Sequence, residues 1–105
     1  MTSRVQPMAL DSGTSSEAAH LQTREVRERS AAIIVSLIAE HGPLTDDALV
    51  EHYRARAHAY TSVPLITPQA IRTRRSELVH AGQVRVAHTD ARSDLGNRAT
   101  AWTLA

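Results

Sequence analysis

Three stretches of the chain repeat their hydrophobic positions with the period of an α-helix. The first covers residues 21–41 and ends at Gly42-Pro43, a dipeptide that stops a helix. The second covers residues 45–58, and Thr45 can cap its first turn. The third covers residues 67–81. The hydrophobic pattern therefore predicts three helices.

The third helix has the clearest boundaries. Thr67 is an N-cap residue type, Pro68 suits the first helical position, and Gly82 suits the left-handed position just past the end. Successive helical residues are rotated by about 100°, which separates an apolar side from a polar side. The apolar side carries Ile71 and Leu78, with Val79 and Ala81 at its margin. The polar side carries Gln69, Thr73, Ser76 and His80, with Arg72 on its flank.

After the third helix the pattern changes to the alternation of a β-strand, in residues 84–88 and again in residues 100–104. Residues 89–99, between them, are rich in turn formers. We therefore predict two short strands joined as a hairpin, in a mainly α fold with a small β-hairpin. On the hairpin and the second helix, the expected core residues are Val84, Val86, Trp102, Leu104, Leu49 and Tyr53. In the connector before the third helix, we expect Val63, Leu65 and Ile66 to pack under that helix.

Residues 1–20 show neither period, so we expect a flexible N-terminal arm followed by one domain, residues 21–105. A chain of 105 residues is long enough for one modest core. The sequence contains no cysteine, no secretory signal and no stretch of about 20 apolar residues. We therefore expect a cytoplasmic protein without disulfides or membrane spans.

Charge is unevenly distributed along the chain. The formal net charge is only +1, which is mildly against nucleic-acid binding. Residues 67–98, however, contain six arginines against three acidic residues. All twelve basic residues of the chain are arginines, which we attribute first to a GC-rich genome. The local excess of positive charge falls on the third helix and the hairpin.

The chain from about residue 24 to residue 104 resembles the small winged helix-turn-helix proteins of actinobacteria and their bacteriophages. The resemblance rests on residues 67–84, a capped helix with paired arginines followed by Leu, Gly and Val, and on residues 98–104, which close the hairpin. In that family the third helix enters the major groove of DNA, and the hairpin tip, called the wing, contacts the backbone or the minor groove. The resemblance implies three helices followed by a two-stranded wing, and a small DNA-binding transcriptional regulator.

Six polar residues are the DNA contacts that the resemblance implies. On the third helix they are Gln69, Arg72, Thr73 and Ser76, whose side chains can form hydrogen bonds with base edges and phosphates. On the wing, residues 89–99, they are Arg92 and Arg98.

Arg74 and Arg75 lie closer to the apolar side of the third helix than to its polar side. We expect one of them to follow the edge of the core and to pair with an acidic residue of the second helix, namely Asp46, Asp47 or Glu51. Arg72 is the better candidate for a DNA contact.

Nothing in the sequence indicates an enzyme or a bound cofactor. The six histidines form no HExxH or comparable spacing with carboxylates, and there is no glycine-rich phosphate loop. His52 and His58 are six residues apart and fall on poorly matched helical faces, so we expect no metal site.

The choice of partner stays open in two respects. The near-neutral charge, with Asp90 and Asp94 in the wing, fits an alternative in which the same surface binds a protein, such as a host transcription or replication component if the chain is a phage protein. One DNA-binding helix makes few contacts, so we also expect a homodimer on a palindromic site, with the first helix as its seam.

Overall fold

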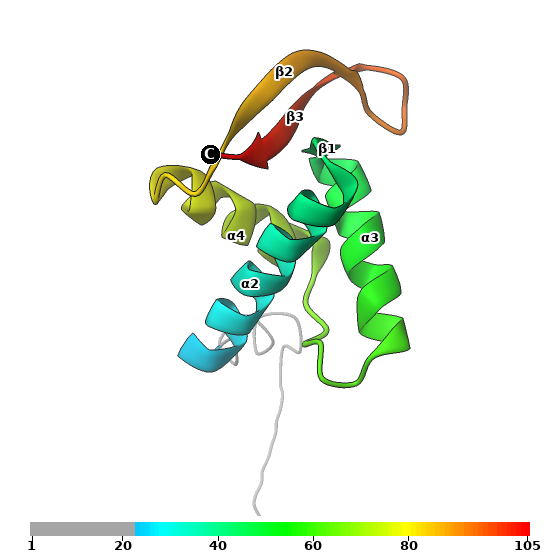
Figure 1. The fold of residues 1–105 in the computed structure, drawn as a ribbon. Helices are drawn as coiled ribbons and strands as arrows, with labels where there is room; N and C mark the ends of the chain where they lie inside the picture. Colours follow the sequence, from blue (N-terminus) through cyan, green and yellow to red (C-terminus); the bar gives the residue numbers. More distant parts are fainter. Residues whose placement is uncertain (1–22) are drawn as a thin grey trace, which may run out of the picture.

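The computed structural model describes residues 23–105, and within them it contains three helices and one three-stranded antiparallel sheet. In chain order the elements are α2 (Arg24–His41), β1 (Leu44–Thr45), α3 (Asp46–Ala59), α4 (Pro68–His80), β2 (Val84–Arg92) and β3 (Arg98–Leu104). Figure 1 shows the hairpin of β2 and β3 lying above the helices, which are all on one side of it. The predicted order of three helices and a hairpin is confirmed, whereas the arm predicted for residues 1–20 lies outside the described residues.

Threonine side chains cap all three of these helices. Thr23, Thr45 and Thr67 each have an extended backbone, and each side-chain oxygen accepts a hydrogen bond from the amide three residues further on. The caps predicted at Thr45 and Thr67, and Pro68 in the first turn, are confirmed. The first helix begins at Arg24 rather than at residue 21, because Thr23 takes the extended conformation of a cap. No helix in this part of the chain is both long enough and apolar enough to cross a bilayer.

Gly82 turns the chain from α4 into the hairpin. Its φ is +77°, in the left-handed region that favours glycine. The amide of Gln83 donates to the carbonyl of Leu78 at 2.9 Å, and the amide of Gly82 donates to the carbonyl of Val79 at 3.0 Å. These bonds satisfy carbonyls that the end of the helix would otherwise leave free, as the sequence predicts.

The sheet contains one strand more than predicted. Leu44–Thr45 forms β1 and pairs with β3, which gives the strand order β1-β3-β2. Trp102 in β3 therefore has Leu44 on one side and Val86 on the other. Two residues are too few to show an alternating pattern, so β1 has no signal in the sequence. The consequence is that the start of α3 is attached directly to the middle strand.

The second strand is also longer than predicted. β2 extends to Arg92, so the connection to β3 covers residues 93–97 rather than 89–99. The register shifts on both sides of His88. Such irregularities interrupt the alternation of the side chains, and this is why the sequence pattern fades before the strand ends.

The core contains side chains from the three helices, the connector before α4, and the sheet, and it includes both residues predicted on the second helix. Its buried members are Ile34, Leu37, Ile38, Leu44, Leu49, Tyr53, Ile66, Ile71, Leu78 and Val84. Trp102 and Leu104 pack against this cluster, as predicted for the inner face of the hairpin. Val86 contradicts the prediction, because it is 44% exposed. Val84, two residues earlier on the same strand, is buried. Leu65 also contradicts the prediction, because it is 72% exposed, whereas Ile66 is buried and Val63 packs against the core.

Tyr53 fixes the connector between α3 and α4 to the core. Its buried hydroxyl donates a hydrogen bond to the carbonyl oxygen of Pro64 at 2.7 Å. Burial raises the pKa of Tyr53 to about 12, since the phenolate would lose its hydration. The long connector is therefore held in place by a specific polar contact as well as by apolar packing.

Candidate nucleic-acid interface

One side of α4 faces away from the core. Ile71, Arg74 and Leu78 are buried on the opposite side. The four contact residues predicted on this helix lie together on the outward side, and none of them is buried: Gln69, Arg72, Thr73 and Ser76. We call this surface the polar face of α4. It presents amide, hydroxyl and guanidinium groups within the first nine positions of the helix.

The hydroxyl of Thr73 is already used as a donor. It donates to the backbone carbonyl of Gln69, one turn earlier, at 3.0 Å. A hydroxyl that donates within its own helix can still accept a hydrogen bond. The side-chain amide of Gln69, by contrast, retains both its donor and its acceptor.

Arg72 lies at the edge of the polar face, beside α3. Its Nη2 is 3.6 Å from Oδ1 of Asp47, and the two side chains remain 39% and 30% exposed. This distance is beyond ordinary hydrogen-bond range. An exposed ion pair of this kind contributes little to stability. The guanidinium therefore keeps donors for another acceptor.

Arg75 is held by a carboxylate and by an aromatic ring. Its Nε and Nη2 donate to the two carboxylate oxygens of Asp46 at 2.9 and 2.7 Å. Its guanidinium carbon also lies 4.1 Å from the centre of the Trp102 ring. Only 15% of the side chain is exposed. The predicted pairing of an arginine with an acidic residue of the second helix is thus confirmed for Arg75, which ties α4 to α3 and to β3.

Arg74 pairs within its own helix. Its Nε and Nη2 donate to the two carboxylate oxygens of Glu77 at 2.9 and 3.0 Å. It lies in the groove between α2 and α4, where it is almost fully buried. The prediction that both Arg74 and Arg75 lie near the apolar side is confirmed.

Arg92 and Arg98 lie at the outer end of the hairpin. They are paired directly across β2 and β3, so their side chains project from the same face of the ribbon. Both are exposed, and Arg92 makes only a long hydrogen bond, 3.4 Å, to the carbonyl of Gly96. Like charges in opposed positions destabilise a hairpin. Their placement therefore does not help to stabilise the hairpin.

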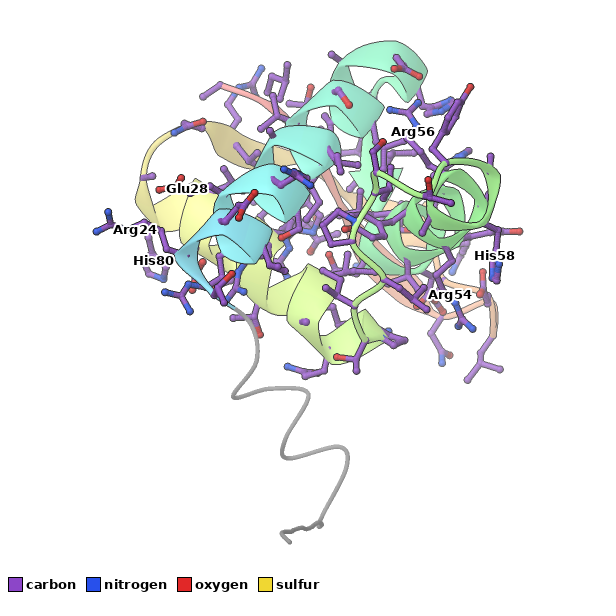
Figure 2. All side chains as sticks on the ribbon, turned by 90° about the horizontal axis from the view of Figure 1, so that it is seen from below. Arg24, Glu28, Arg54, Arg56, His58 and His80 are labelled. Atoms are coloured by element: carbon purple, nitrogen blue, oxygen red, sulfur yellow. The ribbon has the colours of Figure 1, made fainter. Side chains whose placement is uncertain are left out.

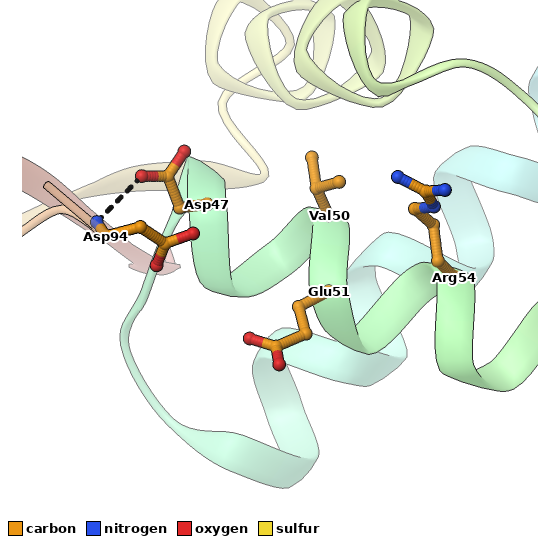
Figure 3. Close-up of a pocket in the computed structure, with 5 residues that line it drawn as sticks. All are labelled: Asp47, Val50, Glu51, Arg54 and Asp94. Atoms are coloured by element: carbon orange, nitrogen blue, oxygen red, sulfur yellow. Dashed lines mark hydrogen bonds between the residues drawn. The ribbon is translucent and has the colours of Figure 1, made fainter.

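Asp47 connects the polar face of α4 with the hairpin tip, residues 93–97. Its Oδ1 faces Arg72, and its Oδ2 accepts a hydrogen bond from the backbone amide of Asp94 at 3.1 Å. Figure 3 shows this bond between the start of α3 and the tip. The sequence does not reveal this role, because an acidic residue in a first helical turn already suits the helix dipole. The two groups of predicted contact residues are thus separate, but one side chain links them.

A shallow groove of about 480 Å³ separates α3 from the hairpin tip. Its lining is mostly charged and consists of Asp47, Val50, Glu51, Arg54 and Asp94 (Figure 3). We call it the acidic groove, because three of its five residues are acidic. Arg54 lies at the end away from the tip, and Figure 2 shows it pointing outward beside His58. The acidic groove borders the polar face, where it would repel phosphate groups.

Three of the histidines, His41, His52 and His88, make contacts within the fold. His41 and His52 stack with ring centroids 3.9 Å apart, which joins the end of α2 to α3. Nδ1 of His88 lies 2.8 Å from Oδ1 of Asp90 within the same strand. Across residues 23–105, no three histidine, aspartate or glutamate side chains are grouped so that they could hold a metal ion.

Comparisons of the chain with protein-family models, with curated proteins and with solved structures found no match. The residues themselves and their contacts are therefore the basis for assigning a function.

Proposed function

We propose that the chain is a sequence-specific double-stranded DNA-binding protein of the winged helix-turn-helix type, and that it acts as a small transcriptional regulator. In this proposal the helix of residues 67–81 lies in the major groove, and the wing, residues 89–99, contacts the backbone or the minor groove. One observation carries the proposal. The inward-facing arginines of α4 are held by acidic residues, whereas the polar face, with Arg72, is left open to a ligand.

The composition of the polar face suits base edges. A glutamine amide can form two hydrogen bonds with adenine, and an arginine can form two with guanine. Gln69 and Arg72 both lie in the first half of α4, the part that helix-turn-helix proteins insert into the groove. We therefore assign Gln69 and Arg72 to base contacts, and Thr73 and Ser76 to contacts with bases or phosphates.

The wing supplies positive charge at the outer end of the hairpin, and Asp47 links its tip to Arg72 on α4. Arg92 and Arg98 are both exposed and adjacent, which suits contact with phosphates or with a narrow minor groove. The acidic groove and the net charge of +1 oppose non-specific binding. We therefore expect weak affinity for arbitrary DNA, with most of the specific affinity coming from base contacts.

A homodimer on a palindromic site belongs to this proposal, with α2 as the expected seam. The exposed large hydrophobic residues of the described part are Tyr60, Leu65, Val86 and Leu95, and none of them is on α2. A seam there would cover the partly buried Val26, Ile33 and Val35 together with small and charged side chains. Light scattering at micromolar concentration tests this point, because a monomeric mass would remove the dimer while leaving the DNA contacts in place.

The decisive experiment selects binding sites from a pool of random duplex DNA at low salt and sequences the retained fraction. Three proteins are compared: the wild type, the double variant Arg72→Ala/Thr73→Ala, and Arg85→Ala. The last variant removes the same charge from an exposed position at the start of β2, outside the polar face and outside the expected seam. We expect an enriched motif for the wild type and for Arg85→Ala, and none for the double variant.

The size of the effect identifies the kind of contact. Arg72→Ala alone should cost about 1–3 kcal/mol of binding free energy if Arg72 contacts a guanine. A loss that is equal for all sequences would make it a phosphate contact instead. If the wild type enriches no motif at low salt, where electrostatic attraction is strongest, sequence-specific DNA binding is refuted.

A protein-binding role is the second candidate, and the acidic groove is the observation that favours it. Leu95 projects from the tip beside this groove and is 87% exposed. Acidic and apolar groups together suit a basic, partly apolar protein surface, such as that of a host transcription or replication component. A protein that binds the wild type but neither Leu95→Ser nor Glu51→Gln would support this role over DNA binding.

A further inference from the structure

Asp47 contacts two elements that we propose to touch DNA, and it belongs to neither of them. One carboxylate oxygen faces Arg72 on α4, and the other accepts the amide of Asp94 at the hairpin tip. Its neighbour Asp46 instead gives both oxygens to Arg75. The two adjacent aspartates therefore have different partners, and only those of Asp47 border the proposed DNA surface.

The Arg72–Asp47 pair has the geometry of an interaction that can be exchanged. At 3.6 Å and with both side chains partly exposed, it is too loose to hold the fold together. It is close enough, however, to offset part of the positive charge of Arg72. A phosphate or a guanine approaching Arg72 must compete with this carboxylate.

We infer that Asp47 is a positioning residue that restrains DNA binding: its charge competes with DNA for Arg72, while its hydrogen bond fixes the hairpin tip to the start of α3. The inference rests on the proposed function and adds a residue that lowers affinity rather than raising it. A restrained arginine binds weakly to arbitrary phosphates, and it is released only where the remaining contacts are good. Asp47 thereby contributes to sequence discrimination.

Asp47→Asn separates the two roles. The asparagine side chain has the same size as aspartate and still has an oxygen that can accept a hydrogen bond from the backbone amide of Asp94. It lacks the negative charge that attracts Arg72. Glu51→Gln is the matched control, since Glu51 lies one turn further along α3, lines the same groove and loses the same charge. The control reports the general effect of making the acidic groove less negative.

The measurement is the dissociation constant for the motif enriched from the random pool or, if none is enriched, for a random-sequence duplex at low salt. We expect Asp47→Asn to bind about three- to fivefold more tightly than the wild type, the range of one exposed ion pair. Glu51→Gln should change the constant less than twofold by the same scale. Damage to the fold would weaken binding, so a gain is not explained by a purely structural role.

Repeating the substitutions in an Arg72→Gln background tests the proposed cause. The gain from Asp47→Asn should fall to the level of Glu51→Gln, because no charge on residue 72 is left to release. If Asp47→Asn and Glu51→Gln give equal gains in the wild-type background, the restraint on Arg72 is overturned while DNA binding stands. If no variant binds duplex DNA at low salt, the restraint fails together with the proposed function.

The second role of Asp47 can be measured without DNA. Amide hydrogen exchange should be slow at Asp94 in the wild type and in Asp47→Asn, and fast in Asp47→Ala, which lacks the acceptor. Equal exchange in all three proteins would overturn the fixing of the hairpin tip. This result does not depend on any ligand, so it distinguishes an error about Asp47 from an error about DNA binding.

Discussion

Arg72 and Arg75 lie three residues apart on α4 and pair with adjacent aspartates on α3, yet they differ in geometry and exposure. Arg75 donates two hydrogen bonds to Asp46 and lies on the Trp102 ring. Arg72 only approaches Asp47 and forms no hydrogen bond with it. The N–H donors of its guanidinium group are therefore left for another acceptor. The difference in exposure follows from position. Arg75 lies against Trp102 of β3, the middle strand, whereas Arg72 lies at the edge of the polar face.

The comparison shows that residue type alone does not mark a binding site. The useful distinction is whether a polar side chain already has a hydrogen-bond or ion-pair partner within the protein. Arg75 is similar to Tyr53 in this respect, because the hydroxyl of Tyr53 also has a hydrogen-bond partner inside the fold, the carbonyl of Pro64. Arg72 belongs with Gln69, Arg92 and Arg98, whose side chains have weak contacts or none to the rest of the described chain.

The largest expected effect comes from removing the held arginine. Arg75→Ala should lower the free energy of unfolding by about 2–4 kcal/mol, because it leaves the partly buried carboxylate of Asp46 without its partner. Arg72→Ala should lower it by less than about 0.5 kcal/mol. Urea denaturation of the two variants measures both values. Similar losses would mean that the contrast between the two arginines has no energetic basis.

An intermediate effect should appear at alkaline pH, through Tyr53. The unfolded tyrosine loses its proton near the ordinary pKa of 10.0, whereas the folded one keeps it to about 12. Between these values the unfolded state binds fewer protons, so stability falls as pH rises. The contribution is fully present below pH 10 and is lost through pH 12, and it is on the order of 3 kcal/mol.

Tyr53→Phe is the control for this prediction. The phenylalanine has no proton to lose, so the fall in unfolding free energy over this pH range should be smaller by that amount. The variant should be less stable at neutral pH, because the carbonyl of Pro64 loses its donor. Parallel pH profiles for the two proteins would show that Tyr53 is not held as the structure indicates.

A smaller effect than that of Arg75 or Tyr53 should come from Gly82, at the opposite end of α4 from the polar face. A Cβ at this position would meet no atom within 4 Å, so only the positive φ opposes a side chain. Gly82→Ala should therefore cost about 1 kcal/mol of stability. DNA affinity should not change once the protein is folded. A loss of affinity larger than that of Arg72→Ala would place the binding surface elsewhere.

Much of the fold could be predicted because its signals are local. A cap residue, its hydrogen bond and the first turn lie within four positions, so Thr45 and Thr67 reveal two helix starts. Gly82 marks an end in the same way. The sides of α4 also follow from helical geometry, which places Arg74 and Arg75 near the core and Gln69 away from it.

The remaining features depend on residues that are distant in the sequence. β1 is a strand only because β3 returns beside it. Val84 and Val86 alternate alike in the sequence, yet only Val84 reaches the core, because burial depends on where the helices end beneath the hairpin. Pairing of Arg75 with the second helix could be predicted, but the choice of Asp46 over Asp47 depends on how α3 and α4 pack. The role of Asp47 additionally requires the hairpin tip to return to α3, which no local pattern indicates.

The position of β3 also has a consequence for biosynthesis. This strand is made after β1 and β2, yet it lies between them and is the hydrogen-bonding partner of both. During translation, neither of the earlier strands can be paired until residues 98–104 have left the ribosome. The helices can gather beforehand, but the core stays open along Leu44 and Val84 until then. We therefore expect a ribosome stalled before this strand emerges to display a chain that proteases cut readily.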